Sequence, residues 1–308
     1  TNQPDLESYQ AQWEELTLER SSGSTLQLRA PLQFSHSGAH DATGALRFLP
    51  HVGNLSRTVV VRSANPTGTR GHVVFLHRAD VDIRYALFKN LGRTTFKPLD
   101  STTFANGGVT HIGTNQIGRY ALHMHHLYGP EVPVPSGNQF TLIGNAVDGS
   151  TKWGITVHDS HFGLVKDNVV YDAQGGGIVT EDGSETANTF DHNFVVRVWG
   201  TGADRADERQ DAGDWSYEGS GLWFRGPNNV VRNNVVANTH SYAVTYMMVR
   251  VPSVLIPDAP GTEPRVPTNM AAVPLKEFAN NEWYASYFGL TLWNLGASCC
   301  TEIFELPV

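Results

Sequence analysis

Residues 154–198 read GITVHDSHFGLVKDNVVYDAQGGGIVTEDGSETANTFDHNFVVRV, and this stretch decides the fold. Three short apolar runs, GITVH, FGLVKD and NVVYD, form one unit, and a second unit begins at GIVTE. Val and Ile favour strands, and the Gly and Asn residues between the runs favour turns. The apolar spacing of three and four that helical repeats need does not occur here. Short strands and turns in units of this size indicate a stacked solenoid.

An asparagine marks the same place in successive units. Asn145, Asn168 and Asn193 are 23 and 25 residues apart, and each precedes a strand-like run. The series extends to Asn90, Asn234 and Asn281. Asparagine hydrogen-bonds the backbone at turns and tolerates left-handed geometry. We therefore predict an all-β fold, a right-handed parallel β-helix in which stacked asparagines satisfy one another along the axis.

The β-helix is expected over residues 58–308, and a β-rich segment over residues 1–57 is expected to cap its open end. Segments 13–18 and 25–28 alternate in the manner of short antiparallel strands. Inserts near 93–117, 200–219 and 250–277 lengthen the repeat. We expect all three to leave from one edge of the solenoid, between the asparagine-led strand of one coil and the glycine-led strand of the next. Insertions gathered on one face often mark a binding face.

Charge and hydropathy limit the partners. The formal net charge is -8, with 22 Lys and Arg against 30 Asp and Glu. No basic cluster suits a phosphate backbone, so we expect no nucleic-acid partner. No apolar run reaches the roughly 18 residues of a membrane span, so we expect no membrane insertion by this chain. It begins at Thr1 without a basic and apolar leader, and we expect it to be part of a longer polypeptide.

Five polar residues follow a shared glycine and apolar pattern at the ends of strand-like runs. They are His77 (VVFLH), His123 (YALH), His158 (GITVH), Glu181 (GIVTE) and Arg225 (GLWFR). On rungs about 4.8 Å apart, the five side chains would form a ladder on one face. This predicts a catalytic or metal-binding groove. The alternative is an external ladder of cross-rung pairs that only stiffens the stack.

Several blocks of the sequence resemble one extracellular family. The blocks are Gly71–His77 (GHVVFLH), Val81–Ala86 (VDIRYA), Gly118–His125 (GRYALHMH) and Glu181–Glu185 (EDGSE). They are similar to the parallel β-helix (PbH1-repeat) region of the family that includes the cell-migration-inducing hyaluronidase, its transmembrane relative and fibrocystin-like proteins, with this chain as a bacterial-type member. The resemblance implies a secreted or cell-surface protein that cleaves or engages a polysaccharide, hyaluronan or another uronate-containing glycan. A non-catalytic glycan-binding or adhesion module of a larger surface protein is the alternative.

For a polysaccharide hydrolase, two carboxyl groups are needed. Glu181 is the leading acid, with Asp159 and Asp182 nearby. Neighbouring residues in an ideal strand point to opposite faces, so Glu181 and Asp182 serve one site only if the strand ends between them. Gly183 favours such a break.

For a polysaccharide lyase, a base must remove the proton beside a uronate carboxylate, and a cation must neutralise that carboxylate. His123 or His158 is the candidate base, since imidazole titrates near neutral pH, and Arg225 is the candidate cation. Tyr246 is a candidate proton donor. Sugar contacts are expected from Trp223, by stacking, and from Arg232, as a local basic group.

A divalent metal ion is the third possibility, with zinc or another first-row metal as the cofactor. His123 and His125 share a face, and His77 and His158 lie on adjacent rungs. Three imidazoles and one carboxylate suit such an ion. His126 is expected to point the other way. Because the ligands must be neutral imidazoles, the site should weaken below about pH 6.

Overall fold

The computed structural model describes residues 12–132, 137–200, 216–248 and 253–293. The chain divides into two compact units, Thr1–Gly53 and Asn54–Val308. Within the described residues, no helix is long and apolar enough to cross a membrane.

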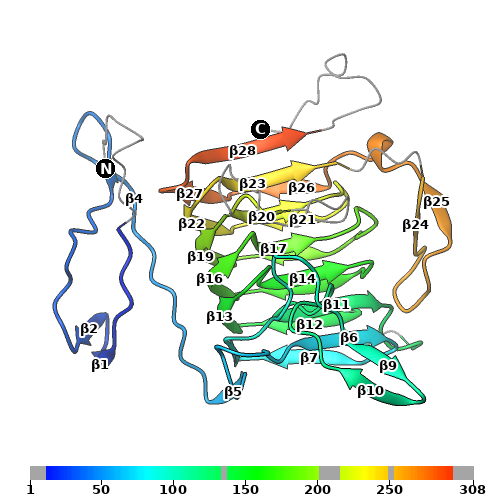
Figure 1. The fold of residues 1–308 in the computed structure, drawn as a ribbon. Helices are drawn as coiled ribbons and strands as arrows, with labels where there is room; N and C mark the ends of the chain where they lie inside the picture. Colours follow the sequence, from blue (N-terminus) through cyan, green and yellow to red (C-terminus); the bar gives the residue numbers. More distant parts are fainter. Residues whose placement is uncertain (1–11, 133–136, 201–215, 249–252, 294–308) are drawn as a thin grey trace. The chain divides into compact units, whose positions relative to one another are not determined.

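The second unit is a parallel β-helix, as predicted, with three strands to each coil (Figure 1). The first sheet contains β6 (Val73–His77), β11 (Leu122–Leu127), β14 (Ile155–His158), β17 (Gly176–Thr180), β20 (Ser220–Phe224), β23 (Tyr242–Met247) and β28 (Phe288–Trp293). The second contains β7 (Val81–Arg84), β12 (Phe140–Ile143), β15 (Gly163–Lys166), β18 (Thr189–Asp191), β21 (Val230–Arg232) and β26 (Glu277–Ala279). The third contains β5 (Val59–Arg62), β8 (Ala86–Lys89), β13 (Ala146–Ser150), β16 (Val169–Gln174), β19 (Phe194–Trp199), β22 (Val235–Thr239) and β27 (Glu282–Tyr284). The runs GITVH, FGLVKD and NVVYD therefore become one strand of each sheet.

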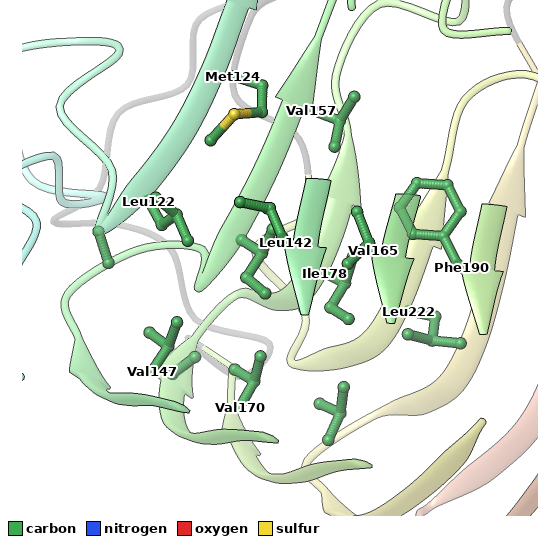
Figure 2. Packing of buried hydrophobic residues seen from close by; sticks show 14 of the residues in the cluster. Leu122, Met124, Leu142, Val147, Val157, Val165, Val170, Ile178, Phe190 and Leu222 are labelled. Carbon is green, nitrogen blue, oxygen red and sulfur yellow. The ribbon is translucent and has the colours of Figure 1, made fainter. Parts of the chain in front are cut away.

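Apolar side chains of all three sheets fill the interior of the coil (Figure 2). Leu122, Ile155, Ile178 and Leu222 come from successive rungs of the first sheet and are fully buried. Burying one such side chain contributes about 1.5–3 kcal/mol. Because side chains alternate along a strand, the residues between these point outward from the first sheet. That outward face carries the candidate site.

Stacked asparagines close one corner of the coil. Asn145, Asn168, Asn193, Asn234 and Asn281 form a ladder, each donating its backbone N–H and its side-chain N–H to the side-chain oxygen of the next. Asn90 is outside the ladder, contrary to the prediction. It follows β8, and the backbone N–H of Ala86, at the start of β8, caps the ladder by donating to Asn145. A second ladder, Asn188 on Asn229, was not predicted.

The first unit contains two antiparallel hairpins. They are β1 (Leu18–Ser22) with β2 (Thr25–Leu28), and β3 (Ala39–His40) with β4 (Leu46–Phe48). The expected strand over 25–28 is present, but that over 13–18 is not. The Glu14 carboxylate accepts hydrogen bonds from the backbone of Gln33 and Phe34, which holds residues 13–17 in an irregular path. The capping role of this segment stays a prediction.

The inserts leave from two corners of the coil rather than one. The insert over 93–117, with its hairpin β9 (Thr103–Ala105) and β10 (Gly108–His111), joins the third sheet to the first, as expected. The insert near 200–219 joins the same two sheets, although residues 201–215 lie outside the described part. The insert over 250–277 instead joins the first sheet to the second, because it follows β23 and ends at β26. It carries the hairpin β24 (Val254–Ile256) and β25 (Val266–Thr268) and the 3-10 turn η2 (Met270–Ala272).

The hairpin β24–β25 runs along the side of the stack (Figure 1). Its tip meets the first coils, where Arg78 donates a hydrogen bond to Gly261 O and lies 3.5 Å from Glu263. The strands of the first sheet end at this corner. The hairpin therefore passes the corner at which the candidate site lies.

Candidate functional site

Four polar side chains form a row on the outward face of the first sheet. His125 pairs with His158 in register, and the backbone N–H of Glu181 donates to Val157 O at 3.0 Å, which places Glu181 on the next rung. The pairing of Val179 with Trp223 places Arg225 beside Glu181. The row is therefore His125, His158, Glu181 and Arg225.

This row corrects the predicted register at two positions. His123 lies opposite Thr156 rather than His158, and His77 lies opposite Leu127. Because side chains alternate with a period of two, a slip of two residues keeps the same face. His123 therefore still points outward, one step toward the start of the strand. His77 is displaced by a bulge at His126, whose φ is 48°.

A cavity of about 680 Å³ opens beside this row. Its lining includes six histidines and Glu181; the histidines are His72, His77, His123, His125, His126 and His158. Contrary to expectation, His126 faces this cavity, because its left-handed backbone breaks the alternation of the strand. The insert over 93–117 returns to the coil at Ile117, Gly118 and Arg119, which form another wall.

The turn after β17 brings two carboxylates to one imidazole. β17 ends at Thr180, and Gly183 has a φ of 89°. As a result, Asp182 Oδ2 lies 2.9 Å from His158 Nε2, and Glu181 Oε2 lies 3.2 Å from His158 Nδ1. The strand was predicted to end between Glu181 and Asp182, but it ends one residue earlier, at Thr180. Both carboxylates therefore still reach one site.

Glu185 holds this turn from beneath. Its side chain is fully buried, and its carboxylate accepts backbone N–H groups from Asp159 at 3.0 Å, Asp182 at 2.8 Å and Gly183 at 2.7 Å. Burial raises the pKa of Glu185. Ser184 donates to Asp159, which also lies 3.0 Å from His126. The EDGSE block therefore fixes the position of Asp182 against His158.

His123 is held as one tautomer under the row. Its Nδ1 lies 3.0 Å from Gly118 O, a carbonyl that can only accept, so Nδ1 carries the proton. Its Nε2 therefore carries a lone pair. This atom is buried without a hydrogen-bond partner and lies 3.9 Å from Glu181 Oε2. Tyr120 donates to the other oxygen of Glu181 at 2.9 Å. A lone pair facing a carboxylate oxygen is a natural place for a cation.

The pKa values of the two half-buried imidazoles in the row, His125 and His158, move apart. Burial, with the charges of His158 and His126, lowers the pKa of His125 to about 4. Burial also disfavours the charged form of His158, but the hydrogen bonds and charges of Asp182 and Glu181 outweigh it and raise the pKa to about 11. His125 Nδ1 and His158 Nδ1 are 2.9 Å apart, so a protonated His158 donates to a neutral His125.

The donors of this cluster fit a first-row divalent cation. His123, His125 and His158 each offer a nitrogen, and these atoms lie within 4.8 Å of one another. Tetrahedral bonds of about 2.05 Å would place ligand atoms about 3.3 Å apart. The separations of 2.9 Å, 3.2 Å and 3.9 Å among these nitrogens and Glu181 Oε2 bracket that value. His77 lines the same cavity but is not part of this group.

Three residues predicted to contact substrate lie elsewhere. Tyr246 is 1% exposed and packs inside the coil against Phe224, and burial raises its pKa, so it cannot donate a proton in the cavity. Trp223 is outward but 0% exposed, covered within a small cluster with Tyr120, Trp153 and Val179. Arg232 ends β21 in the second sheet and pairs with Asp191 and Glu277.

Sequence reasoning missed several residues that build the cavity. Tyr120, His72, Arg119 and Glu185 were not singled out, although all four stand in the sequence blocks GHVVFLH, GRYALHMH and EDGSE. The glycine that begins each of the first two blocks, Gly71 and Gly118, could have signalled the close backbone approach of these segments. Gly92, with a φ of 86°, donates to Gly71 O at that contact.

Comparison with known proteins places this architecture in a family. The chain matches the CEMIP beta-helix family over residues 94–290, more than half of its 308 residues. Fibrocystin-L of Mus musculus is 28% identical over 207 residues, covering 65% of this chain and 4% of the relative. Cell migration-inducing and hyaluronan-binding protein of Homo sapiens is 27% identical, covering 58% of this chain and 14% of the relative.

A third relative, Cell surface hyaluronidase CEMIP2 of Homo sapiens, is 26% identical over 272 residues. That match covers 81% of this chain and 19% of the relative. The chain thus spans less than one fifth of the length of each of these relatives. The family match covers more than half of the chain and the coil is a parallel β-helix, so the chain belongs to the CEMIP beta-helix family.

Proposed function

We propose that this chain is the polysaccharide-cleaving β-helix of a secreted or cell-surface protein, and that it cleaves a uronate-containing glycan such as hyaluronan. The observation that carries the proposal is the cavity itself, where imidazoles of opposite proton affinity and two carboxylates meet on one face. The names of two relatives, a cell surface hyaluronidase and a hyaluronan-binding protein, support the choice of glycan.

The working groups are His123, His125, His158 and Glu181, with Asp182 and Arg225 beside them. Asp182 orients His158 through Nε2, and Tyr120 orients Glu181 through its other oxygen. His125 and Glu181 line the cavity and face the substrate there. Arg225 adds positive charge near Asp182 and Glu181.

A divalent cation is the proposed cofactor, held by His123, His125, His158 and Glu181, and its binding would displace the proton that His158 otherwise carries. When bound, it would supply a Lewis acid that neutralises developing negative charge on the substrate. The buried Nε2 of His123, which has no hydrogen-bond partner, supports this choice. Elemental analysis of protein purified without an affinity tag should find one equivalent of a first-row metal, lost in His125→Ala and retained in His192→Ala, an exposed histidine of the second sheet. Metal at equal content in both variants would contradict the ligand set.

Turnover and binding should separate in one substitution. Glu181→Gln keeps the shape of the side chain but removes its charge, so we expect cleavage of hyaluronan to fall by at least about 100-fold with binding retained. Asp191→Asn, a carboxylate of the second sheet paired with Arg232, is the matched control and should cleave normally. Newly formed unsaturated uronate ends would identify elimination, and saturated ends would identify hydrolysis.

A binding module is the second candidate function. It is favoured by the relative whose name gives hyaluronan binding rather than cleavage. In that case the wild type and Glu181→Gln would both bind the polymer, and neither would shorten it.

A further inference from the structure

One end of the cavity is basic, and the working groups described above do not use it. Arg119 and His72 line this end, and Arg93 adjoins them. Three backbone segments meet here, since Gly92 N donates to Gly71 O at 2.8 Å and Arg93 N donates to Arg119 O at 2.8 Å. The two arginines are therefore fixed side by side at the base of the insert over 93–117.

Neither guanidinium has an acidic partner among the residues that the structure describes. Arg119 Nη1 reaches only Ile117 O, at 3.5 Å, and Arg93 Nε is buried without a hydrogen-bond partner. Arg57 and Arg70 of the same unit likewise donate to backbone carbonyls, whereas Arg84 pairs with Asp82 and Arg232 with Asp191. Arg93 and Arg119 differ because they lie close enough for each charge to act on the other.

The pair is electrostatically unfavourable as it stands. Burial lowers the pKa of Arg119, and the charge of Arg93 lowers it further. Burial and these two charges lower the pKa of His72 to about 4, so His72 is neutral and can donate or accept one hydrogen bond. Partly buried like charges cost free energy unless an anion offsets them. An anionic ligand is what this wall lacks.

The position of the wall relates it to the working groups. His72, Val74 and Leu76 line the cavity in succession along β6, and His77 ends the strand. Val74 pairs with His123 and Leu76 with His125, so His72 lies about two residues, or about 7 Å, before the first histidine of the cluster. A glycan lying along β6 would therefore meet the arginines immediately beside the histidine cluster.

We propose that Arg93 and Arg119 form a carboxylate subsite that binds a uronate of the glycan and sets its register against the cleaving groups. This inference rests on the proposed function and names the residues that select an anionic over a neutral chain. Arginine suits the role because its planar donors match a carboxylate in two hydrogen bonds. The subsite is a binding element rather than part of the reacting groups.

The test compares hyaluronan oligosaccharides with the same oligosaccharides whose carboxyl groups are methyl esters. Isothermal titration with the wild type should show tighter binding of the acid form. Arg119→Gln should weaken binding of the acid form by about 10- to 100-fold, as expected for loss of a charge-assisted hydrogen bond, and leave the ester form unchanged. Arg93→Gln should act in the same direction, and Arg119→Lys should recover part of the loss.

Arg232→Gln is the matched control, since Arg232 ends a strand of the second sheet outside the cavity. Equal binding of acid and ester forms by the wild type would overturn the subsite while leaving the proposed function intact. Binding of neither form would overturn both. The comparison of acid and methyl ester binding uses the wild-type protein alone. It therefore tests the subsite even if substitution of an arginine prevents folding.

Discussion

At the scale of single residues, the turn Glu181–Glu185 shows how a fold builds a site. Glu181 faces the cavity, and Asp182 binds His158. Gly183 adopts the left-handed backbone conformation of the turn that joins β17 to Glu185. Glu185, buried below, gathers three backbone N–H groups. The positions of the Glu181 and Asp182 carboxylates thus depend on Glu185, which does not line the cavity.

Glu185→Ala should destabilise the protein more than any exposed acid does. It leaves three N–H groups without an acceptor, of which that of Gly183 is buried and those of Asp159 and Asp182 are partly buried, so we expect the free energy of unfolding to fall by about 3 kcal/mol. Denaturant titration measures this. Glu263→Ala, whose side chain is 64% exposed, is the control and should change stability by less than about 0.5 kcal/mol. A loss for Glu185→Ala as small as the control would show that Glu185 is dispensable to the turn.

At the scale of elements, the asparagine ladder and the outward row both stack one side chain on each coil, but they differ in how completely their polar atoms are hydrogen-bonded. The ladder is internal and satisfied, so it stabilises the corner of each coil. The outward face is partly unsatisfied, because the buried His123 Nε2 lacks a hydrogen bond. Buried polar groups without partners are expected at sites of function rather than of stability.

Asn193→Ala tests the ladder. The side chain makes four hydrogen bonds, to Val165 O and Asn234 Oδ1 and from two donors of Asn168. We expect a loss of at least about 3 kcal/mol in the free energy of unfolding. Asn281→Ala, at the half-buried end of the ladder, should cost less, because solvent can replace its bonds. Equal losses at the two positions would mean that stacking inside the ladder adds nothing.

At the scale of the whole molecule, sequence predicted the coil but not its lateral details. A period of 23 to 25 residues with three apolar runs determines a three-strand coil, and the structure has three parallel sheets. The register of His123 was wrong because YALHMH fits the glycine-led pattern in two ways that differ by two residues. Periodicity cannot separate them, since both keep the same face outward.

The periodicity of the sequence also could not predict which outward residues are buried. Trp223 points out of the coil, yet Trp153 and Tyr120 cover it, and Trp153 is bonded to Ser216 O in the second insert. Whether an outward residue is covered depends on the path of the inserts, and the inserts do not follow the sequence repeat of the coil. Tyr246, in contrast, could have been placed in the core, because it pairs with the inward Phe224. His125, His158, Glu181 and Asp182 were foreseen as site candidates, and the structure brings them together.

Cleavage of a uronate-containing glycan at this cavity is the central proposal for the whole molecule. The most direct measurement is the molar mass of hyaluronan during incubation with the wild-type chain, followed by size-exclusion chromatography with light scattering. We expect the molar mass to fall with time for the wild type and to stay constant for Glu181→Gln. A constant molar mass with the wild type, or an equal fall with both proteins, would contradict it.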